Sequence, residues 1–459
     1  MDIERIPDMV ADLRATFDRG RTRTLPWRLA QLDAFKRMLH EQRDAICEAL
    51  AQDLGRPSFE AWSAEIAALA KELEHIQKNL ASWVKPDRVS APLVLQPGKA
   101  RIYKDPLGVV LVIAPWNYPF QLLMSPVLGA IAGGNCAVLK PSEVSPATSA
   151  LVAKIVPRYF DTSAIRVVEG AVPETTKLLE QRFDHIFYTG NGHVGRIVMA
   201  AAAKHLTPVT LELGGKSPTY VDRSADLDVT ARRIMWGKLY NAGQTCVAPD
   251  YVLAHAEIHD ALLERMVKVV REFHGPDSKK SPDFGRIVNG RHHARLTALL
   301  DNAGTVVLGG EGDADERYLA PTILKDVPPD APVMQEEIFG PILPVLKVSG
   351  VDEAVAFINA RPKPLAMYIF TDDRGPRDAL LERTSAGGVL VNHVILHLVA
   401  PDLPFGGVGE SGMGAYHGRA SFDTFTHHKS VLMKPFAIDP PLLYPPYDAT
   451  KRKWLSRLI

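Results

Sequence analysis

The sequence predicts an α/β protein built from two parallel-sheet domains, on three observations. The chain has 459 residues, which is too long for one small core because domains usually contain roughly 100 to 200 residues. Between 108 and 213, continuous apolar segments alternate with helical stretches, a pattern typical of a parallel sheet covered on both faces. A second succession of the same kind follows Gly214. We therefore expect a cleft between the two domains.

The N-terminal part is predicted to be helical. From 27 to about 80, apolar residues recur at three- and four-residue spacing, as in LAQLDAFKRMLHEQRDAICEALAQDL. Cys47 lies on such an apolar face, and we interpret it as a small buried hydrophobe because no neighbour would activate its thiol. From 86 to 103 the pattern changes to prolines and short β-prone pieces, which predict a hairpin that leaves the main body.

The first sheet is expected to be Rossmann-like, which is the usual architecture for dinucleotide binding and places ligands at the carboxyl ends of the strands. Its predicted strands are 108–114, 136–140, 165–170, 185–190 and 207–213, with helices near 119–132, from 145 onward, near 173–180 and near 191–204. In the second domain we expect helices near 225–240 and 257–274, and strands at TVVLG, PVLKV, AMYIF and GGVLVN.

The composition argues against several classes of function. The 53 basic and 53 acidic residues balance, so no global field attracts nucleic acid or an acidic membrane surface. Hydrophobic residues at 46% and charged residues at 23% match ordinary globular usage, which argues against disorder and fibrous architecture. A small, weakly charged ligand is therefore expected.

The cysteines and the apolar runs indicate a cytoplasmic protein. Only three cysteines occur, none in C-x-x-C spacing, so neither a disulfide framework nor a structural zinc site is predicted, and no spacing suggests a catalytic metal. The N-terminus alternates acids and bases without the apolar core of a signal peptide. The sequence contains no run of about 18 apolar residues, so no transmembrane segment is predicted.

Two features could bind a dinucleotide. The segment 190–195 has G-x-G-x-x-G spacing between a predicted strand and helix, where backbone amides and the helix dipole favour a phosphate. Glu212 stands about twenty residues on, at the place of the ribose ligand in such motifs. A lone glycine pattern is weak evidence, however. Lys140 and Glu143 in LKPSE follow the second strand and could reach ribose hydroxyls, or form a solvated surface pair.

The segment NAGQTCVAPDY contains the best candidate nucleophile, Cys246. Its neighbours Gly243, Gln244 and Thr245 are small or polar, which predicts an exposed thiol. A nucleophilic thiol needs a pKa below the usual value of about 8.5, which helix termini, amide dipoles or a cation can provide. A structural cysteine is the alternative. Cys136, in contrast, opens the apolar strand CAVLK, so core packing is expected for it.

Two further polar residues follow predicted strands. Glu212 in TLELGGKSP ends an apolar strand before two glycines, which predicts a place in the cleft. Burial there would raise its pKa and let it take a proton from water, while a salt-bridged interdomain residue is the alternative. Asn117 in WNYP could donate its side-chain amide to an oxyanion, or could simply form a turn.

Seven segments, taken in order, resemble the aldehyde dehydrogenase superfamily: PWNYPF, LKPSE, YTGNGHVG, LELGGKSP, GQTC, EEIFGP and LPFGGVGESGMG. Three more, CVAPDY, PILP and AYHGRASFDTFTHHKS, are similar to its class 3 branch, which includes the fatty and aromatic aldehyde enzymes. The similarity covers nearly the whole chain and is strongest from about 103 to 435.

This resemblance implies NAD(P)-dependent oxidation of medium- or long-chain aliphatic or aromatic aldehydes to acids, through a thiohemiacetal and a thioester on Cys246. Asn117 and the Cys246 amide would bind the oxyanion, and Glu212 would be the base rather than a ribose ligand. Lys140 and Glu143 would bind the adenosine ribose of the cofactor, and the glycine segment would lie along its pyrophosphate. The segment EEIFGP would contact the nicotinamide ribose and ring. These implied cofactor residues are Trp116, Lys140, Glu143, Gly190, Asn191, Gly195, Leu213, Glu337 and Phe339.

The sequence departs from the class 3 pattern at two positions. Asn191 stands where a small hydroxyl residue is usual, and His393 replaces an aspartate, although His397 is kept. Glu143 should repel a 2′-phosphate, which favours NAD, while class 3 enzymes often also accept NADP. The lipophilic substrate site is expected to include Tyr118, Trp236, Thr245, Ile395 and His397.

The implied division of the chain has three parts. Residues 1–82 and 103–211 would bind NAD(P), 212–403 would form the catalytic domain, and 83–102 with 404–459 would form an oligomerisation element and tail. Relatives pair through such an element, so a homodimer is expected. The basic ending KRKWLSRLI is interpreted as a solvated or docking terminus.

Two other classes of function were weighed. A thiol-dependent esterase could use Cys246 and Glu212 without redox chemistry, but it would have no use for a dinucleotide site. A structural or ligand-storage descendant of a dehydrogenase would normally have lost one of these two residues, and both are present.

Overall fold

The first sheet of the computed structural model, which describes residues 3–458, has the strand order β17-β7-β6-β3-β4-β5. The strands from β7 to β5 are parallel, and β17 adds antiparallel to β7. Strand β3 reads VVLVI and is buried at every position, because helices cover both faces of the sheet. The bounds are β3 Val109–Ile113, β4 Cys136–Lys140, β5 Ile165–Val167, β6 His185–Gly190, β7 Val209–Leu213 and β17 Gly412–Met413.

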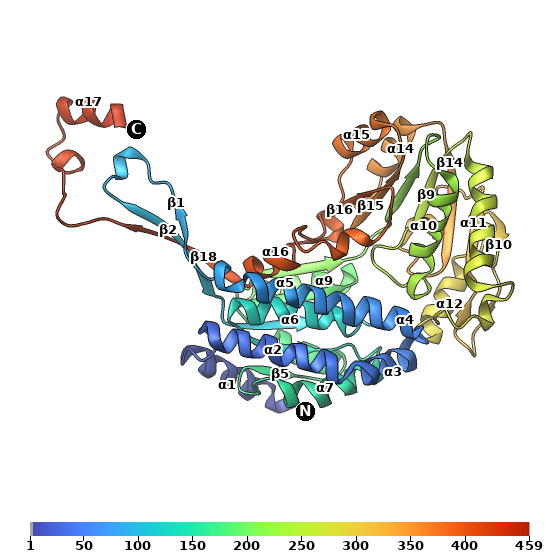
Figure 1. Cartoon of the computed structure of the whole chain (residues 1–459), viewed down its shortest axis with the longest axis horizontal. Coiled ribbons are helices and arrows are strands. Elements are labelled where there is room, and N and C mark those ends of the chain that lie inside the picture. The colour runs from blue at the N-terminus through green and yellow to red at the C-terminus, as the bar shows by residue number, and fades with distance from the viewer. Residues whose placement is uncertain (1–2, 459) are drawn as a thin grey trace.

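The helices around this sheet come mostly from the first half of the chain (Figure 1). The sequence QLLMSPVLGAIAG of α6 is almost entirely buried, which explains why it shows no polar face. The bounds are α1 Ile6–Asp18, α2 Leu25–Glu41, α3 Arg43–Leu54, α4 Ser58–Ala61, the π-helix η2 Trp62–Ala67, α5 Ala68–Trp83, α6 Gln121–Gly133, α7 Pro146–Tyr159, α8 Val172–Leu179 and α9 Gly192–Ala203.

The second sheet has the order β10-β13-β14-β9-β8-β15-β16 and is parallel except at β10. Its strands are β8 Pro218–Val221, β9 Tyr251–His255, β10 Thr305–Leu308, β13 Thr322–Lys325, β14 Ile342–Val348, β15 Ala366–Phe370 and β16 Gly388–Val391, beside the small pair β11 Gly312–Asp313 and β12 Tyr318–Leu319. Its helices are α10 Leu227–Leu239, α11 His259–His274, α12 Gly290–Ala298, α13 Pro332–Gln335, α14 Val351–Asn359 and α15 Arg374–Arg383. The predicted pair of parallel-sheet domains is therefore confirmed.

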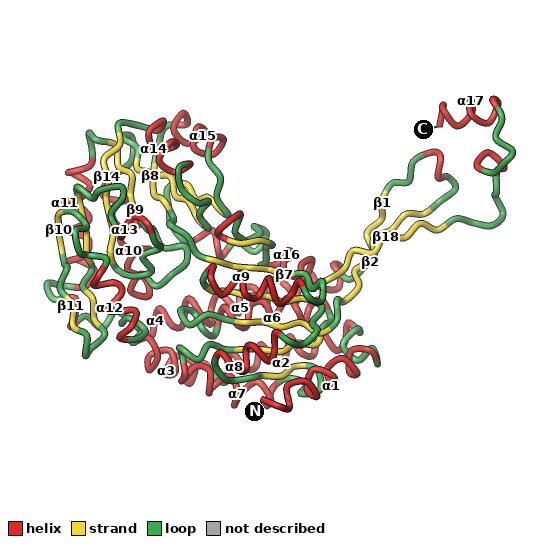
Figure 2. The backbone as a smooth tube through the Cα atoms, turned by 180° about the vertical axis from the view of Figure 1, so that it is seen from behind, coloured by secondary structure: helices red, strands yellow, loops and turns green. Residues whose placement is uncertain are grey.

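An arm projects from the first domain (Figures 1 and 2). It is the antiparallel sheet of β1 Asp87–Val89, β2 Lys99–Pro106 and β18 Thr426–Met433. Beyond it, the chain ends in α17, Ala449–Leu458. Short 3-10 turns occur at Ile3–Arg5, Leu93–Leu95, Tyr240–Gly243, Ser278–Lys280, Leu396–Val399, Gly409–Ser411 and Pro441–Leu443.

Part of the C-terminal segment returns to the first domain. We expected residues 404–459 to belong to the oligomerisation element, but β17 pairs with β7, and α16 (Gly418–Thr424) packs on α5 and α6. The reason is apolar packing. Phe422 and Phe425 are completely buried, and a Cβ at Gly129 of α6 would lie 2.8 Å from the Phe425 ring.

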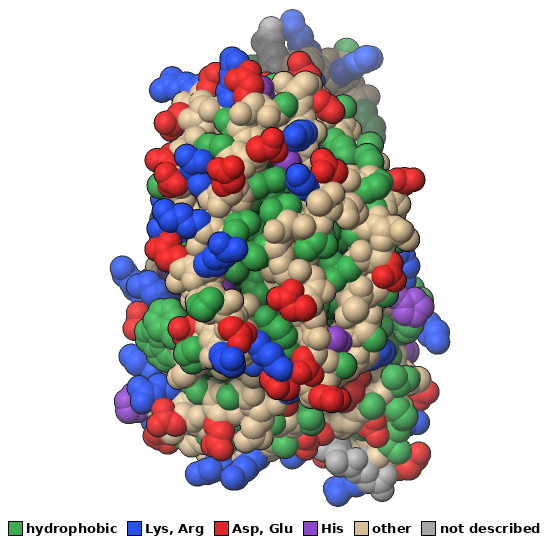
Figure 3. Space-filling view, turned by 90° about the vertical axis from the view of Figure 1, so that its right-hand side faces the viewer, with side chains coloured by type: hydrophobic (Ala, Val, Ile, Leu, Met, Phe, Trp, Pro, Cys, Tyr) green, Lys and Arg blue, Asp and Glu red, His purple; other side chains and the backbone are tan. Residues whose placement is uncertain are grey.

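The two sheets meet at the Gly214–Gly215 linker, since β7 ends at Leu213 and β8 begins at Pro218. Acidic and basic side chains are interspersed over the face seen in Figure 3, in line with the balanced net charge. Among the described residues, no helix combines the length and the apolar content needed to span a bilayer.

Candidate active site

The loop that carries Cys246 follows α10 in an unusual backbone conformation. Asn241, Ala242 and Gly243 have φ values of 54°, 51° and 76°, so three successive residues are left-handed. This conformation is costly for residues with a Cβ, and it turns the chain sharply after the helix. Thr245 is buried, and Cys246 is half-buried at the end of the turn.

Asn117 and Tyr118 bring the first domain onto this loop. They follow the carboxyl end of β3, and ligands of parallel sheets usually bind at the carboxyl ends of the strands. The Asn117 Nδ2 donates to the carbonyl oxygen of Gln244 at 3.1 Å, and the hydroxyls of Tyr118 and Thr245 lie 2.7 Å apart. The side-chain amide of Asn117 is thus held next to the residues that precede Cys246.

Glu212 is a buried acid without partners. It lies near the end of β7 with 3% of its surface exposed, and neither carboxylate oxygen has a hydrogen-bond partner. Burial raises its pKa well above the usual value. The alternative of a salt-bridged interdomain residue is therefore not what the structure contains.

The thiol of Cys246 lies in a site shaped by acids. Burial raises its pKa to about 12, and the nearby carboxyl groups of Glu337 and Glu212 add to the effect. The predictions of an exposed thiol with a lowered pKa are therefore wrong for the protein without cofactor, because the surrounding groups bury the sulfur and carry negative charge. The backbone amides of Cys246 and Val247 point toward the sulfur and act in the opposite direction. These amides are also the donors that an oxyanion formed at this sulfur would need.

Glu337 and Phe339, the residues predicted to contact the nicotinamide ribose and ring, are both held by close packing. Glu337 Oε1 is buried without a partner, and burial raises the pKa of this acid to about 8. A Cβ at Gly214 would lie 2.0 Å from Glu337 Oε2, so a larger residue there would displace the Glu337 carboxylate. Phe339, with φ of 53°, packs edge-on against Trp116 at 5.2 Å between ring centroids. The free Glu337 Oε1 could accept a hydroxyl group, and the two rings offer an aromatic surface beside it.

The remaining predicted cofactor residues line the carboxyl end of the first sheet. Lys140 is buried, and its Nζ lies 3.4 Å from Glu143, whose side chain is 46% exposed. Asn191 caps α9 by accepting from the Val194 amide at 3.0 Å, so this departure from the class 3 pattern preserves the helix start. Gly190 ends β6, and Gly195 of α9 faces Leu213, where a Cβ would approach the leucine to 2.9 Å.

The predicted substrate residues of the second domain form an aromatic and apolar group. Trp236 packs against Tyr240 and His393 with ring centroids 5.5 and 5.8 Å away. Ile395 has φ of 65° and contacts the Gly237 backbone region. Both ring nitrogens of His397 are buried without partners, and burial lowers its pKa to about 4, so the ring is neutral.

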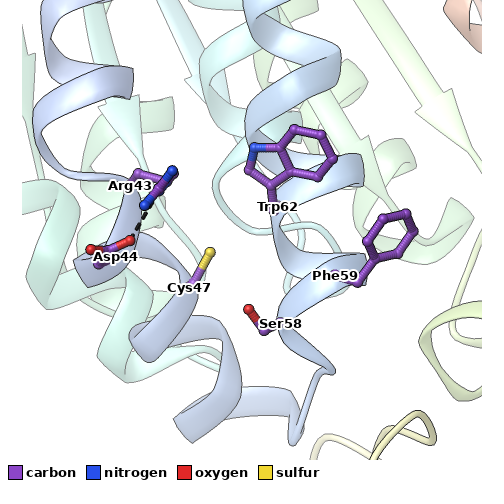
Figure 4. A pocket seen from close by; sticks show the side chains of 6 residues that line it. All are labelled: Arg43, Asp44, Cys47, Ser58, Phe59 and Trp62. Carbon is purple, nitrogen blue, oxygen red and sulfur yellow. Dashed lines mark hydrogen bonds and ion pairs between the residues drawn. The ribbon is translucent and has the colours of Figure 1, made fainter.

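The other cysteines lie outside this site. Cys136 is completely buried in β4, and burial raises its pKa to about 12, as expected for core packing. Cys47, which we interpreted as a buried hydrophobe, is instead half-buried and lines a surface pocket of about 650 Å³ (Figure 4), although its inner side packs against the core. Its pKa is also raised by burial. Within residues 3–458, no cluster of His, Cys, Asp or Glu could hold a metal ion.

Sequence reasoning missed three residues that reach the site from behind: Arg56, Glu65 and Asn241. Arg56 and Glu65 form a completely buried ion pair, and Arg56 also donates to the backbone carbonyl of Asn117. A single arginine before a proline in a helical region gave no signal. Asn241 was visible in NAGQTC but was interpreted only as a neighbour of the cysteine.

Comparisons with known proteins agree with one another. The model of the aldehyde dehydrogenase family matches residues 1–431. "Aldehyde dehydrogenase, dimeric NADP-preferring" of Rattus norvegicus is 52% identical over 94% of both chains. "Aldehyde dehydrogenase family 3 member A2" of Mus musculus is 50% identical over 97% of this chain and 92% of its own length. A solved structure titled "Substrate bound state of Staphylococcus Aureus AldH" matches with a TM-score of 0.96 and 45% identity, covering 98% of both chains.

Proposed function

This chain belongs to the aldehyde dehydrogenase family, and we propose that it oxidises apolar aldehydes, of medium or long aliphatic chain or aromatic, to carboxylic acids with NAD(P). The observation that carries the proposal is the buried, unpartnered Glu212 beside the thiol of Cys246. An acid that is kept without a partner in a protein interior is costly, and a water-activating base is a use that explains the cost.

In the first step, the thiolate of Cys246 adds to the aldehyde carbon and forms a thiohemiacetal alkoxide. The backbone amide of Cys246 and the Asn117 side chain supply the donors for this oxyanion. One such donor is typically worth about 3 to 4 kcal/mol in the transition state. A nicotinamide held by Glu337 and Phe339 would supply the hydride acceptor for the oxidation of this adduct to the thioester.

In the second step, Glu212 removes a proton from a water molecule that attacks the thioester carbon. The raised pKa of Glu212 makes its carboxylate a stronger base than an exposed one. The acid product then leaves and the thiol is restored. This need for a base also favours hydrolysis over transfer of the acyl group to a thiol acceptor such as coenzyme A.

The substrate class rests mainly on the resemblance to class 3 enzymes, and the side chains of the predicted substrate site support it. Trp236, Tyr240 and Ile395 present rings and an aliphatic chain, and Tyr118 is buried beside Thr245. The one histidine of the predicted set, His397, is kept neutral by burial. An uncharged, lipophilic aldehyde suits these surroundings.

We expect the cofactor site to accept both NAD and NADP. The relative from Rattus norvegicus is named NADP-preferring, whereas Glu143 alone would disfavour a 2′-phosphate. Because its side chain is 46% exposed and lies next to Lys140, Glu143 can turn into solvent and leave the lysine to a phosphate. Measuring Kd for both cofactors with wild type and Glu143→Gln would test this, since the variant should gain NADP affinity only.

We further propose that the protein is a homodimer that acts in the cytoplasm. The arm of β1, β2 and β18 leaves Val89, Leu432 and Met433 exposed by 46%, 45% and 39%, which suits a second copy of the chain. The three free cysteines suit a reducing compartment. Light scattering at working concentration should give the mass of two chains, and the mass of one would refute the dimer.

The decisive test measures absorbance of the reduced nicotinamide with a panel of aliphatic and aromatic aldehydes and each cofactor in turn. Wild type should produce the signal, and Cys246→Ala should not. If no pair gives a signal while an activated ester is hydrolysed, the protein is a thiol-dependent esterase and the proposal fails.

A further inference from the structure

An irregular helix of the first domain contacts the loop of residues 241–246, which we call the nucleophile loop because it carries Cys246. The segment from α4 to α5 contains the π-helix η2 between Trp62 and Ala67, at the end of the first domain that faces α12 (Figure 1). At about 100° per residue, positions five apart on an α-helix point about 140° away from each other. Hydrogen bonding from i to i+5 brings such positions closer to one face. Glu60 and Glu65 are five apart. Glu60 contacts the nucleophile loop directly, and Glu65 contacts it only through Arg56.

The contacts of the two acids differ in kind. Glu60 Oε2 accepts directly from the backbone amide of Asn241 at 2.9 Å. Glu65 Oε2 accepts from the backbone amides of Phe120 and Gln121, at 2.9 and 2.8 Å, at the start of α6. Its Oε1 pairs with the Arg56 guanidinium. Glu65 therefore fixes Arg56 to the helix that follows Asn117.

The guanidinium of Arg56 connects the two halves of the site. Its Nε donates to Asn241 Oδ1 at 3.1 Å, and another nitrogen donates to the backbone oxygen of Asn117. It also lies 4.5 Å above the ring of Tyr118. Asn117 and Tyr118 belong to the first domain, while Asn241 belongs to the second. One planar group thus sets how the oxyanion residue sits relative to the nucleophile loop.

Asn241 completes the connection. Its Nδ2 donates to the backbone oxygens of Asn117 and Gln244, at 2.9 and 3.0 Å. Because the amide, the side-chain oxygen and the side-chain nitrogen are all engaged, the left-handed backbone of Asn241 and Ala242 is held from several directions. Strained conformations of this kind persist where the surroundings over-determine them.

We propose that Arg56 and Asn241, held by Glu65 and Glu60, are positioning residues that align the side-chain amide of Asn117 with the thiol of Cys246. We call these four residues the interdomain network. The proposal rests on the proposed function, because alignment matters only if an oxyanion forms at Cys246. A buried ion pair adds little net stability, so the geometry that it enforces is the better reason for its presence.

The alignment predicts a specific kinetic defect. A displacement of reacting groups by about 1 Å can lower the rate by about 100-fold. Arg56→Lys keeps the charge but loses the planar fork that reaches Glu65, Asn241 and Asn117 together. It should lower kcat by about 10- to 100-fold, while KM for the aldehyde and Kd for the cofactor change by less than about threefold. Asn241→Ser should have the same kind of effect.

Arg28→Lys is the matched control. Arg28 is also a buried arginine, 4% exposed against 3% for Arg56, and it donates to the backbone oxygens of Ala132 and Arg23, both at 2.9 Å. It lies in the same domain, and none of its contacts touches the nucleophile loop. Arg28→Lys should lower the thermal midpoint, because it disturbs a buried arginine, while kcat stays within about twofold of wild type.

The experiment measures kcat, KM, the burst of reduced cofactor and the rate at which iodoacetamide alkylates Cys246, followed by mass spectrometry. Expected are a lower kcat, a slower burst and an alkylation rate changed at least threefold for Arg56→Lys and Asn241→Ser, but not for Arg28→Lys. The inference is overturned if the first two variants keep wild-type kcat and alkylation rate, or if Arg28→Lys shows the same kinetic losses.

Two features keep the test decisive. If Arg56→Lys does not fold, Asn241→Ser alone decides, because it removes no buried charge. If wild type oxidises no aldehyde, the proposed function has failed, and the alkylation rates still show whether the network holds the cysteine loop. An unchanged alkylation rate in Asn241→Ser would then end the structural part of the inference as well.

Discussion

Two buried acids, Glu212 near the end of β7 and Glu72 in α5, differ in whether their carboxylates have partners. Glu72 accepts from Ser125 Oγ at 2.5 Å and from the Gly418 amide at 3.2 Å, and it lies 3.3 Å from His417. Burial would raise its pKa, but His417 and these hydrogen bonds outweigh burial, so the pKa is lowered. Glu212 has no partner, and burial alone raises its pKa.

The presence or absence of hydrogen-bond partners distinguishes a structural acid from a catalytic one more clearly than burial does. A satisfied carboxylate stabilises the fold, whereas an unsatisfied one destabilises it and is retained for what it does. Glu72 joins α5 to the C-terminal segment, and Glu212 faces the thiol of Cys246. Substitution of the two acids should therefore give opposite effects on stability and activity.

The largest effect is expected for Glu212→Gln. Steady-state turnover should fall by about 10³-fold or more, while one burst of reduced cofactor is retained, because only the second step needs the base. The folded-state pKa of Glu212 is raised, so its contribution to stability falls as pH rises above the unfolded value of about 4.3. Glutamine does not titrate, so the variant should gain about 1 to 3 kcal/mol at pH 7 in urea unfolding.

A normal steady-state rate in Glu212→Gln would remove Glu212 from the second step. A loss of stability would contradict the view that the acid is unsatisfied.

Asn117→Ala tests the residue that connects the interdomain network to the loop before Cys246. Its backbone oxygen accepts hydrogen bonds from Arg56 and Asn241, and its side-chain amide donates to the Gln244 carbonyl oxygen. The substitution should lower kcat by about 10²- to 10³-fold through loss of an oxyanion donor. Asn135→Ala is the control, since Asn135 is buried and donates to Ala130 and Phe425 in the core. The control should lose stability and keep its kcat, and the reverse pattern would refute the assignment.

The pH dependence of alkylation tests the cleft directly. Because burial and the two acids raise the pKa of Cys246 to about 12, the thiolate fraction of the cofactor-free protein should rise about tenfold per pH unit. Alkylation of Cys246 should thus be about 100-fold faster at pH 9 than at pH 7. A rate that levels off between these values would show a thiol pKa near or below 8.

The smallest effect is expected for Glu72→Gln. Glutamine cannot accept from Ser125, Gly418 and His417 without turning its NH₂ group toward one of them, so the variant should lose about 1 to 3 kcal/mol at pH 7. The lowered pKa of Glu72 means that its contribution is present above about pH 4.3 and is lost as pH falls. The variant should accordingly show a flatter loss of stability from pH 5 to 3, with kcat within about twofold of wild type.

The sequence predicted the fold class because its signals are local. Strands such as 109–113 are continuously apolar, and the helices between them have clear bounds. Cys246 and Glu212 were visible because small or polar residues flank them where a core would need apolar ones. The glycine spacing, in contrast, suggested a ribose role for Glu212, since spacing alone cannot tell which way a cofactor lies.

Other features have no local signal. Arg56 and Glu65 are charged residues nine positions apart, and only the folded chain shows that they pair behind Asn117. The π-helix leaves no recognisable pattern in WSAEIA. The return of β17 to β7 involves two residues, too few to be recognised as a strand. Such features arise from tertiary packing, which a single sequence does not reveal.

The return of the C-terminal segment also determines the order in which the protein can mature on the ribosome. The first domain lacks β17 and α16 until residues 412–424 have been synthesised, after the entire second domain. Until then, Glu72 lacks the Gly418 amide and His417, and the groove of α6 that Phe425 fills stays open to water. Domains usually fold in the order in which they are synthesised. Here the first domain emerges first but is completed last. A chain released before residue 418 would therefore leave the Glu72 carboxylate without its partner at Gly418, in a core that is not yet complete.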